Sequence, residues 1–269
     1  MVPVSIVIIT KNEAATIANC IEMASYITDD IVVVDNGSTD ETLKIVKETG
    51  CRLYQTDWQG YGANKNKGIA LARYNWILSI DADEMPDMEL VLSLYDLDLE
   101  DANVVYDIKF KSYFGKKLIR HGSWGRDHHL RLFNRTVVNW SESQVHETLL
   151  LPKGIQIKKL SGYLHHHSVQ NIAECNAKAI YYARLSAIQY LSAGKKATFI
   201  KLYISPAFAF VKNYFFQLGF LDGNEGLAIA LMRHKNTRLK YGYLKLYQQG
   251  LHTADTGTRS INKKLAVEY

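Results

Sequence analysis

The chain has 269 residues, of which 47% are hydrophobic and 22% charged, values typical of a globular protein with one large domain or a domain and an appendage. Its three cysteines have neither metal-site spacing nor an even count, which argues against a disulfide framework and favours reduced thiols in a cytoplasmic protein. The first residues enter a predicted strand without a basic segment or cleavage site, so we expect no signal peptide.

The net charge of +5 is distributed unevenly along the chain. Residues 1–100 carry 7 Lys and Arg against 17 Asp and Glu, residues 101–194 carry 13 against 6, and residues 195–269 carry 12 against 4. A basic second half can attract anionic lipid headgroups or a phosphorylated acceptor, although a solvated surface of lysines explains it equally well. No segment matches an aromatic-interleaved nucleic-acid module, so we expect no nucleic-acid partner.

The first 95 residues alternate short β-rich runs with helical patterns. The apolar runs predict four strands, at residues 4–9, 31–34, 52–55 and 76–80. The segments between them predict three helices, at residues 13–25, 38–49 and 61–72. This alternation implies a parallel sheet with right-handed crossovers.

Local signals predict both ends of the second helix. Ser38 is expected to be its N-cap, and Glu41 three residues later completes a capping box. Gly50 is expected to end the helix at the C′ position.

The pattern changes in the second half of the chain. Residues 104–160 predict short strands separated by polar turns, including 104–110 and 130–133. After Ser161 the pattern is helical, and 171–191 is its clearest stretch. The polar residues from His252 onward are predicted to be disordered.

Residues 198–232 are rich in apolar and aromatic side chains. Their longest uncharged run, 202–211, is too short to cross a ~30 Å hydrocarbon core, so we expect no transmembrane helix here. The stretch predicts either core helices or an amphipathic surface that rests on a membrane.

The most informative motif is Asp81-Ala82-Asp83, which follows the apolar strand at 76–80. Two carboxylates one residue apart at the carboxyl end of a strand form a hard oxygen site that suits Mg²⁺ or Mn²⁺ shared with a substrate's phosphates. The strand at 31–34 also ends in an acid, Asp35, and open α/β sheets bind ligands at this edge. A D-x-D motif by itself is more often a solvated turn or cap, so its weight comes from the neighbouring motifs.

Polar residues at the ends of the first two strands are suited to a nucleoside. Thr10, Asn12, Glu13 and Asp35 can supply hydrogen bonds to the edge of a uracil ring and a carboxylate for a ribose hydroxyl. The alternative is that Asn12 and Glu13 only begin a helix.

A glycine-rich segment, residues 60–68, precedes the D-A-D strand. Its glycines let the backbone approach a ligand closely, while Lys65 and Asn66 can contact a diphosphate or a base. The segment is neither a Walker loop nor the dinucleotide motif, so it is weak evidence alone.

Together these motifs resemble those of the family-2 glycosyltransferases, which have the GT-A fold. The matching segments are the strand with its T-K-N-E end (5–13), V-V-D-N-G-S-T-D (33–40), G-Y-G-x-N-K-N (60–66) and D-A-D-E (81–84). Later segments resemble the subgroup that adds glucose to the lipopolysaccharide inner core: Trp124, Asp127, R-L-F (131–133), V-H-E (145–147) and G-F-L-D-G (219–223). The similarity covers roughly residues 3–250, and Lys65 stands where the family more often has Arg.

The resemblance implies an α/β fold of the GT-A type: a Rossmann-like mixed sheet flanked by helices, with a helical C-terminal extension. We expect a catalytic domain at 1–160, in which 1–95 bind the nucleotide sugar and 96–160 the acceptor. A helical region at 161–250 and a flexible tail at 251–269 should follow.

The resemblance also implies an inverting hexosyltransferase that uses a UDP-sugar, with UDP-glucose as the expected donor and Mg²⁺ or Mn²⁺ as the cofactor. The expected acceptor is a lipopolysaccharide core or a similar lipid-linked saccharide, reached by peripheral contact with the anionic inner face of the cytoplasmic membrane. Two alternatives stay open: a glycosyltransferase of another surface polysaccharide, and a non-catalytic nucleotide-sugar-binding protein.

The same resemblance assigns candidate residues. The general base is expected to be Glu147, with Asp127 in reserve; the alternative is that Glu147 is a surface residue near the strand end. The nucleotide-sugar-binding residues are expected to be Thr10, Asn12, Glu13, Asp35, Gly37, Ser38, Gly62, Lys65, Asn66, Asp81 and Ala82.

The metal is expected to be held by Asp83, with Asp81 and His166 contributing. His166 is the middle residue of a histidine triplet, 165–167, which would be incidental on an exposed turn. Arg126, Arg131 and Arg135 are suited to a diphosphate or a phosphorylated acceptor, or else form surface ion pairs.

Overall fold

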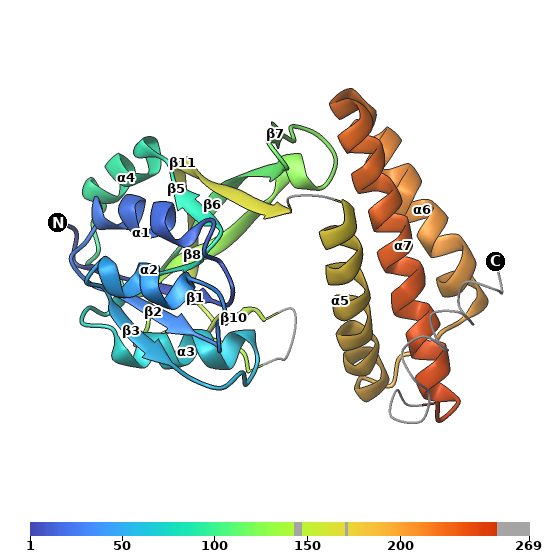
Figure 1. The fold of residues 1–269 in the computed structure, drawn as a ribbon, viewed down its shortest axis with the longest axis horizontal. Helices are drawn as coiled ribbons and strands as arrows, with labels where there is room; N and C mark the ends of the chain where they lie inside the picture. Colours follow the sequence, from blue (N-terminus) through green and yellow to red (C-terminus); the bar gives the residue numbers. More distant parts are fainter. Residues whose placement is uncertain (143–146, 170–171, 252–269) are drawn as a thin grey trace. The chain divides into compact units, whose positions relative to one another are not determined.

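The computed structural model describes residues 1–142, 147–169 and 172–251. The chain forms two compact units (Figure 1): the first holds Met1–Arg120 and Trp124–Ser168, and the second holds His121–Ser123 and the chain from Val169 onward. The boundary expected at residue 160 falls inside a strand of the first unit. The tail expected at 251–269 lies outside the described residues, apart from Leu251.

The first unit is built around one mixed sheet. Its strands are β1 (Val4–Thr10), β2 (Ile31–Asp35), β3 (Arg52–Gln55), β4 (Trp76–Asp81), β5 (Glu84–Pro86), β6 (Val104–Phe114), β7 (Lys117–Leu118), β8 (His128–Asn134) and β11 (Gln156–Val169). They lie in the order β3-β2-β1-β4-β8-β6-β11-β5, and β7 pairs with β6. The first four strands are parallel, whereas β8 is antiparallel to β4 and β6, and β5 is antiparallel to β11.

Helices cover both faces of this sheet, so β1 is buried along its whole length. Val4, Ile6 and Ile8 belong to a hydrophobic cluster with α1 (Ile17–Ser25) and α4 (Met88–Tyr95). The alternate residues Val7 and Ile9 belong to a second cluster with α3 (Tyr61–Leu71) and β9 (Asn139–Trp140), which pairs with β10 (Leu149–Leu150). This arrangement explains why the strand is apolar on both faces from Ile6 to Ile9.

The predicted strands and helices of the N-terminal part are confirmed, with two corrections at helix starts. The first helix begins at Ile17 and not at Glu13, since Asn12 has a left-handed backbone (φ 57°) and a turn follows it. The predicted capping box of α2 (Thr42–Glu48) is wrong, because the Ser38 hydroxyl donates to Asp35 instead of capping the helix. The predicted stop at Gly50 is confirmed, with φ at 74° directly after the helix.

The predicted change to helix at Ser161 is wrong. β11 continues to Val169, with Leu160 and Leu164 buried on the sheet. Its pairing with β5 stabilises an extended conformation that the local pattern did not reveal. The following helix, α5 (Ile172–Ser192), agrees with the predicted 171–191.

The second unit is helical. After α5 come η2 (Ile200–Ile204), α6 (Ser205–Val211), η3 (Lys212–Phe216), η4 (Gly219–Asp222) and α7 (Gly223–Gln248). The core joins side chains of α5, η2 and α7, among them Ala187, Leu202 and Tyr243. No helix among the described residues has both the length and the apolar character needed to cross a membrane.

The G-F-L-D-G motif makes the turn before α7 and holds the short segment 121–123. The Asp222 carboxylate accepts a hydrogen bond from the His121 amide at 2.8 Å, and the Gln217 carbonyl accepts one from the Gly122 amide at 2.9 Å. A Cβ at Gly226 would lie 1.9 Å from the Gly219 carbonyl oxygen, so glycine is required for this close approach.

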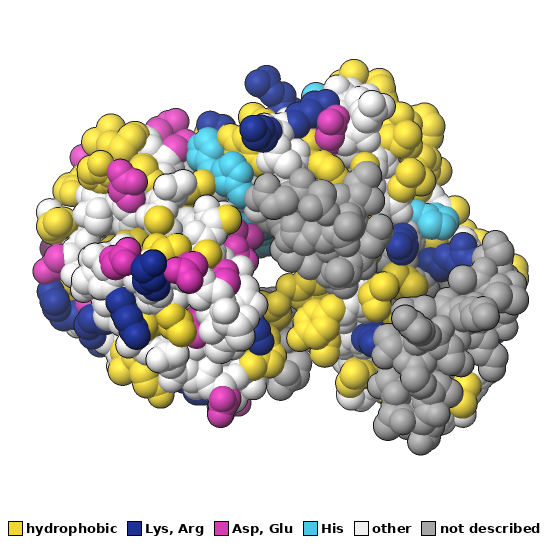
Figure 2. Space-filling view, in the orientation of Figure 1, with side chains coloured by type: hydrophobic (Ala, Val, Ile, Leu, Met, Phe, Trp, Pro, Cys, Tyr) yellow, Lys and Arg dark blue, Asp and Glu magenta, His cyan; other side chains and the backbone are white. Residues whose placement is uncertain are grey.

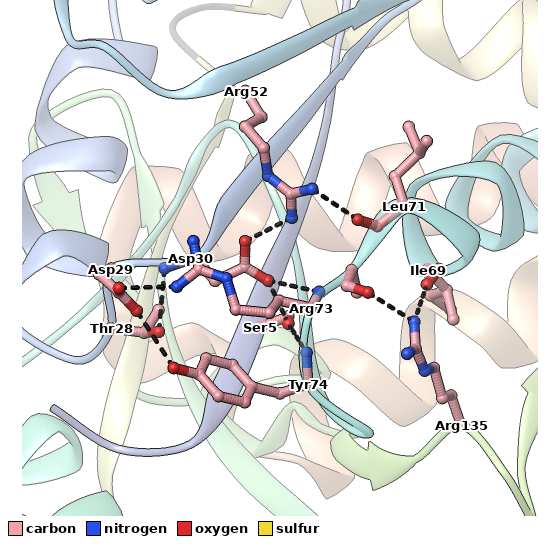
Figure 3. Close-up of polar contacts among 11 residues, drawn as sticks. Ser5, Thr28, Asp29, Asp30, Arg52, Ile69, Leu71, Arg73, Tyr74 and Arg135 are labelled. Atoms are coloured by element: carbon pink, nitrogen blue, oxygen red, sulfur yellow. Dashed lines mark hydrogen bonds and ion pairs between the residues drawn. The ribbon is translucent and has the colours of Figure 1, made fainter.

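A buried carboxylate organises the amino ends of the strands (Figure 3). Asp30 accepts hydrogen bonds from the Ser5 hydroxyl, from the Arg52 guanidinium and, at 2.7 Å, from the Arg73 amide. The Ser5 hydroxyl in turn accepts one from the Tyr74 amide at 2.9 Å. This network ties the chain entering β2 to the chain entering β1 and β4.

Replacing Asp30 by alanine should destabilise the protein by about 3 kcal/mol, because it leaves a buried hydroxyl, an amide and a guanidinium without their shared acceptor. Urea unfolding would measure the loss. The adjacent Asp29→Ala variant is the control, since Asp29 is exposed, where its ion pair with Arg73 and its 3.4 Å hydrogen bond from the Tyr74 hydroxyl contribute little, and it should unfold almost like the wild type. Equal stabilities of the two variants would contradict the role given to Asp30.

Candidate active site

The carboxyl ends of three parallel strands meet at one level of the sheet. Thr10 of β1 pairs with Asp35 of β2, and Ile9 pairs with Asp81 of β4. The motifs that end these strands are therefore neighbours in space, as the sequence predicts.

The D-A-D turn is fixed by Glu84, the next acidic residue. Glu84 is buried, accepts a hydrogen bond from the Asp81 amide at 3.0 Å, and forms an ion pair with Arg131 of β8. Burial raises the pKa of Glu84, and the Arg131 guanidinium opposes this rise. Ala82 is buried in the core below the turn, so the two aspartates flank an anchored residue.

The Asp81 carboxylate faces two cations. Arg131 Nη2 lies 3.4 Å from one of its oxygens, and Lys65 Nζ lies 3.2 Å from the other. Burial raises the pKa of Asp81, but Lys65 and Arg131 outweigh it and hold this pKa well below the usual range. Asp81 is therefore held as an anion by two cations, which it shares with Glu147 and Glu84.

Strand alternation separates the three histidines of the triplet, which lies within β11 and not on an exposed turn. His165 and His167 stack on Tyr113, with ring centroids 5.7 and 4.5 Å away. His166 pairs with Glu84 in the sheet register, and its Nε2 atom lies 3.4 Å from Asp83 Oδ2. Only the middle histidine is thus directed to the D-A-D turn.

Asp83 and His166 fit a divalent cation as a pair. Their 3.4 Å separation is close to the ~3 Å between neighbouring ligands that each lie about 2.1 Å from one metal. Among the described residues, no group of three or more His, Cys, Asp or Glu side chains is arranged to hold a metal ion. The pair therefore suits a cation that takes its remaining ligands from substrate phosphates and water.

The helix α3 carries the glycine-rich motif and clamps the segment around β9. The Asn66 amide group donates to the Trp140 carbonyl at 2.9 Å and accepts from the Trp140 amide at 3.1 Å. A Cβ at Gly62 would lie 1.8 Å from the Ser141 carbonyl oxygen and 3.4 Å from Glu147 Cβ. Gly62 and Asn66 thus bring the chain that carries Glu147 against α3.

Lys65 joins this segment to the D-A-D motif. Its side chain is 2% exposed, and Nζ lies 2.9 Å from Glu147 Oε1, 3.2 Å from Asp81 Oδ1 and 4.6 Å from the centre of the Trp140 ring. The structure therefore places Glu147 beside the D-A-D motif.

The reserve base, Asp127, lies at the start of β8 and pairs with His129 at 3.1 Å. Burial raises its pKa, but the His129 hydrogen bond and charge outweigh this and lower it. A carboxylate stabilised as an anion in this way is a weaker proton acceptor than one with an ordinary pKa.

The loop after β2 is built around Asp35. One oxygen of this buried carboxylate accepts from the Gly37 and Ser38 amides at 2.9 and 3.0 Å, and the other from the Ser38 hydroxyl. Gly37 has a φ of 84°, which this turn requires. Asp35 therefore shapes the loop from within.

The loop after β1 is bonded to the same turn. The Asn12 side-chain oxygen accepts a hydrogen bond from the Thr39 backbone amide at 2.7 Å, and the Asn12 backbone amide donates one to the Ser38 hydroxyl at 2.9 Å. The Glu13 backbone amide donates to the Thr42 hydroxyl. Two buried side-chain oxygens, Thr10 Oγ1 at the end of β1 and Asn64 Oδ1 in α3, have no hydrogen-bond partner among the described residues. Such atoms are what a bound ligand would satisfy.

Two features of the site go beyond the sequence prediction. The sequence predicted no role for Glu84 of the D-A-D-E motif. In the structure Glu84 fixes the D-A-D turn, and it lies opposite His166 in the sheet register. Among the three arginines, Arg131 is directed to Asp81, whereas Arg135 donates to the Ile69 and Ala72 carbonyls at the end of α3 (Figure 3).

The pair of His166 and Asp83 predicts a pH effect in metal-free protein. Burial lowers the pKa of His166, but the hydrogen bond and charge of Asp83 outweigh it and raise this pKa to about 9. The pair's contribution to stability is therefore complete below the unfolded pKa of about 6.5 and is lost as pH rises through about 9.

With a metal chelator present, we compare the free energies of unfolding of the wild type and of His166→Gln. The wild type's excess should fall by up to about 3 kcal/mol as the pH rises from about 6.5 to about 9. Urea titrations across this range would measure it. His167→Gln is the control, because burial lowers the pKa of His167 and no such loss is expected. A difference that does not vary with pH would refute the assigned pair.

Comparison with known proteins shows the family to which the chain belongs. The model of the family Glycosyl transferase family 2 matches residues 5–149. A glycosyltransferase of Rickettsia prowazekii, RP128, described as uncharacterized, is 30% identical over 243 residues, which cover 86% of this chain and 83% of the relative.

A second relative is the lipopolysaccharide core biosynthesis glycosyltransferase LpsC of Rhizobium meliloti, 32% identical over 224 residues that cover 79% of this chain and 81% of LpsC. Among solved structures, S. aureus TarS in complex with UDP-GlcNAc is 15% identical, with 93% of this chain and 92% of that chain covered and a TM-score of 0.48. The family match and the sequence relatives show that this chain, with its mixed α/β sheet of the GT-A type, belongs to glycosyl transferase family 2.

Proposed function

We propose that this glycosyltransferase transfers a hexose, with glucose the first choice, from a UDP-sugar to a lipopolysaccharide core or a similar lipid-linked saccharide. The observation that carries the proposal is the position of Glu147, which one buried lysine links to the D-A-D carboxylate Asp81. A potential base and a potential diphosphate site thus lie side by side, as a transfer reaction requires.

The donor site is proposed at the level where β1, β2 and β4 end. The loops after β1 and β2 are bonded to each other, and the unpartnered Thr10 and Asn64 oxygens can accept hydrogen bonds from a base or a ribose. Asp83 and His166 would hold the divalent cation, which neutralises charge on the departing diphosphate when bound.

The reaction is proposed to invert the anomeric carbon. Glu147 Oε1 takes the proton of the acceptor hydroxyl while the hydroxyl oxygen bonds to the anomeric carbon and the bond to UDP breaks. Lys65 holds the Glu147 carboxylate in place beforehand, and a carboxylate suffices because proton removal accompanies bond formation. The name of the LpsC relative supports a lipopolysaccharide-core acceptor.

A thermal-shift panel of UDP-, GDP- and TDP-sugars, with and without Mn²⁺, tests the donor. A ligand that binds the native state raises Tm by mass action, so no acceptor is needed. We expect a Mn²⁺-dependent rise with UDP-glucose that His166→Gln weakens and His167→Gln leaves intact. No rise with any nucleotide sugar would overturn the proposed donor site, and a rise without slow donor hydrolysis would favour a non-catalytic binding protein.

Glu147→Gln tests the base. The amide oxygen can still accept a hydrogen bond from Lys65, so donor binding should match the wild type, while kcat should fall by about 10²- to 10⁴-fold. Single-turnover donor consumption and the Tm shift with UDP-glucose would measure the two effects. Glu142→Gln, an exposed change on the same segment, should alter neither. Retained turnover in Glu147→Gln would remove Glu147 from this role.

A further inference from the structure

The helical unit has one helical stretch, residues 199–216, with two different faces. This stretch comprises η2, α6 and η3 and the residue before them. Its buried residues, Leu202, Pro206 and Asn213, recur four and eleven positions apart and so lie on one side of the helix. The unit therefore buries one stripe of the stretch and leaves large side chains elsewhere on it exposed.

The opposite side is exposed although it is almost wholly apolar. Ile204, Phe208 and Phe215 repeat at the same intervals, offset by two residues from the buried set, and are 54%, 57% and 53% exposed. The α6 face is defined as the exposed large apolar side chains of this stretch: Phe199, Ile200, Tyr203, Ile204, Phe208, Val211, Phe215 and Phe216. Figure 2 shows hydrophobic side chains on the visible surface of the helical unit.

The charges around the α6 face have one sign. Residues 195–221 contain four lysines and no Asp or Glu. Lys201 and Lys212, both exposed, are eleven residues apart, or about three helical turns, so they lie on one side of the stretch. Lysines beside an apolar stripe can keep their stems on apolar surface while their ammonium groups reach anionic headgroups.

We propose that the α6 face docks on an anionic lipid bilayer, with the helix parallel to the membrane plane. Contiguous exposed apolar surface of this kind marks an interaction site, and the aromatic residues suit the region between headgroups and acyl chains. A second copy of the chain would bring the same lysines into opposition, whereas anionic headgroups complement them. The stretch lies on the membrane and does not cross it.

This inference adds a membrane partner to the proposed function and rests on that function only for its biological purpose, which is access to a lipid-linked acceptor. The surface belongs to the helical unit, whereas the proposed donor site belongs to the first unit. The two can therefore fail separately.

The full chain should be sedimented with vesicles of phosphatidylcholine, with and without phosphatidylglycerol. We expect binding to the phosphatidylglycerol vesicles that decreases with salt. The double variant Ile204→Ser/Phe208→Ser should weaken it at least about tenfold, because two apolar side chains no longer enter the bilayer. Lys201→Gln/Lys212→Gln should weaken it about tenfold and reduce the salt dependence.

Matched controls come from the first unit. Met88→Ser/Leu92→Ser changes two side chains on α4 with the same spacing and with 50% and 61% exposure, and Lys153→Gln/Lys158→Gln removes two exposed lysines. Both controls should bind vesicles like the wild type. The UDP-glucose Tm shift, measured on every variant, verifies folding and tests the donor site separately.

Absence of vesicle binding by the wild type, or equal binding by the α6-face variants and their controls, would overturn the inference. Sedimentation velocity without lipid tests the alternative that a second copy of the chain binds the α6 face. A wild-type dimer that Ile204→Ser/Phe208→Ser converts to a monomer would assign the α6 face to a second copy and overturn the membrane assignment.

Discussion

The buried ammonium of Lys65 is the interaction on which the rest of the site depends. It lies between Asp81 and Glu147, so it links the end of β4 to the segment that follows β9. Removing the lysine would leave two carboxylates close together without a counter-charge, and removing either carboxylate would leave a buried cation poorly paired. Gly62, Lys65 and Asn66 recur at helical spacing, so they lie on one face of α3. Gly62 allows the backbone of Ser141 to approach α3, Asn66 bonds to the backbone of Trp140, and Lys65 supplies the charge.

The two ends of the parallel strands are built on opposite principles. At the amino ends, the Asp30 carboxylate shares its oxygens among several donors of the chain itself (Figure 3). At the carboxyl ends, Thr10 and Asn64 have buried oxygens that no described residue hydrogen-bonds, and Asp83 faces a histidine instead of a permanent cation. Satisfied polar groups stabilise a fold, whereas unsatisfied ones are tolerated where a ligand completes them. The donor site is therefore proposed at the carboxyl ends alone.

Sequence periodicity was sufficient for the elements whose structure is decided locally. The Val and Ile runs predicted β1 and β2, and Gly50 predicted the end of α2. It failed where a distant partner decides: β11 stays extended because it pairs in the sheet, and Ser38 is drawn away from α2 by Asp35. For the histidine triplet, the resemblance named His166, whereas periodicity does not reveal that β11 places this histidine opposite Glu84. Gly62, expected to approach a ligand, instead admits the backbone of Ser141.

The occurrence of Lys at position 65, where the resemblance leads one to expect Arg more often, follows from the space this side chain fills. An ammonium is a compact point charge with three donors, and here it has two carboxylates and the face of Trp140 around it. A guanidinium can also face two carboxylates, as Arg131 does with Asp81 and Glu84, but it is a broader planar group than an ammonium and would need more room in this buried position. Lysine is thus the residue that matches a site in which a single cation must hold the candidate base and the D-A-D carboxylate together.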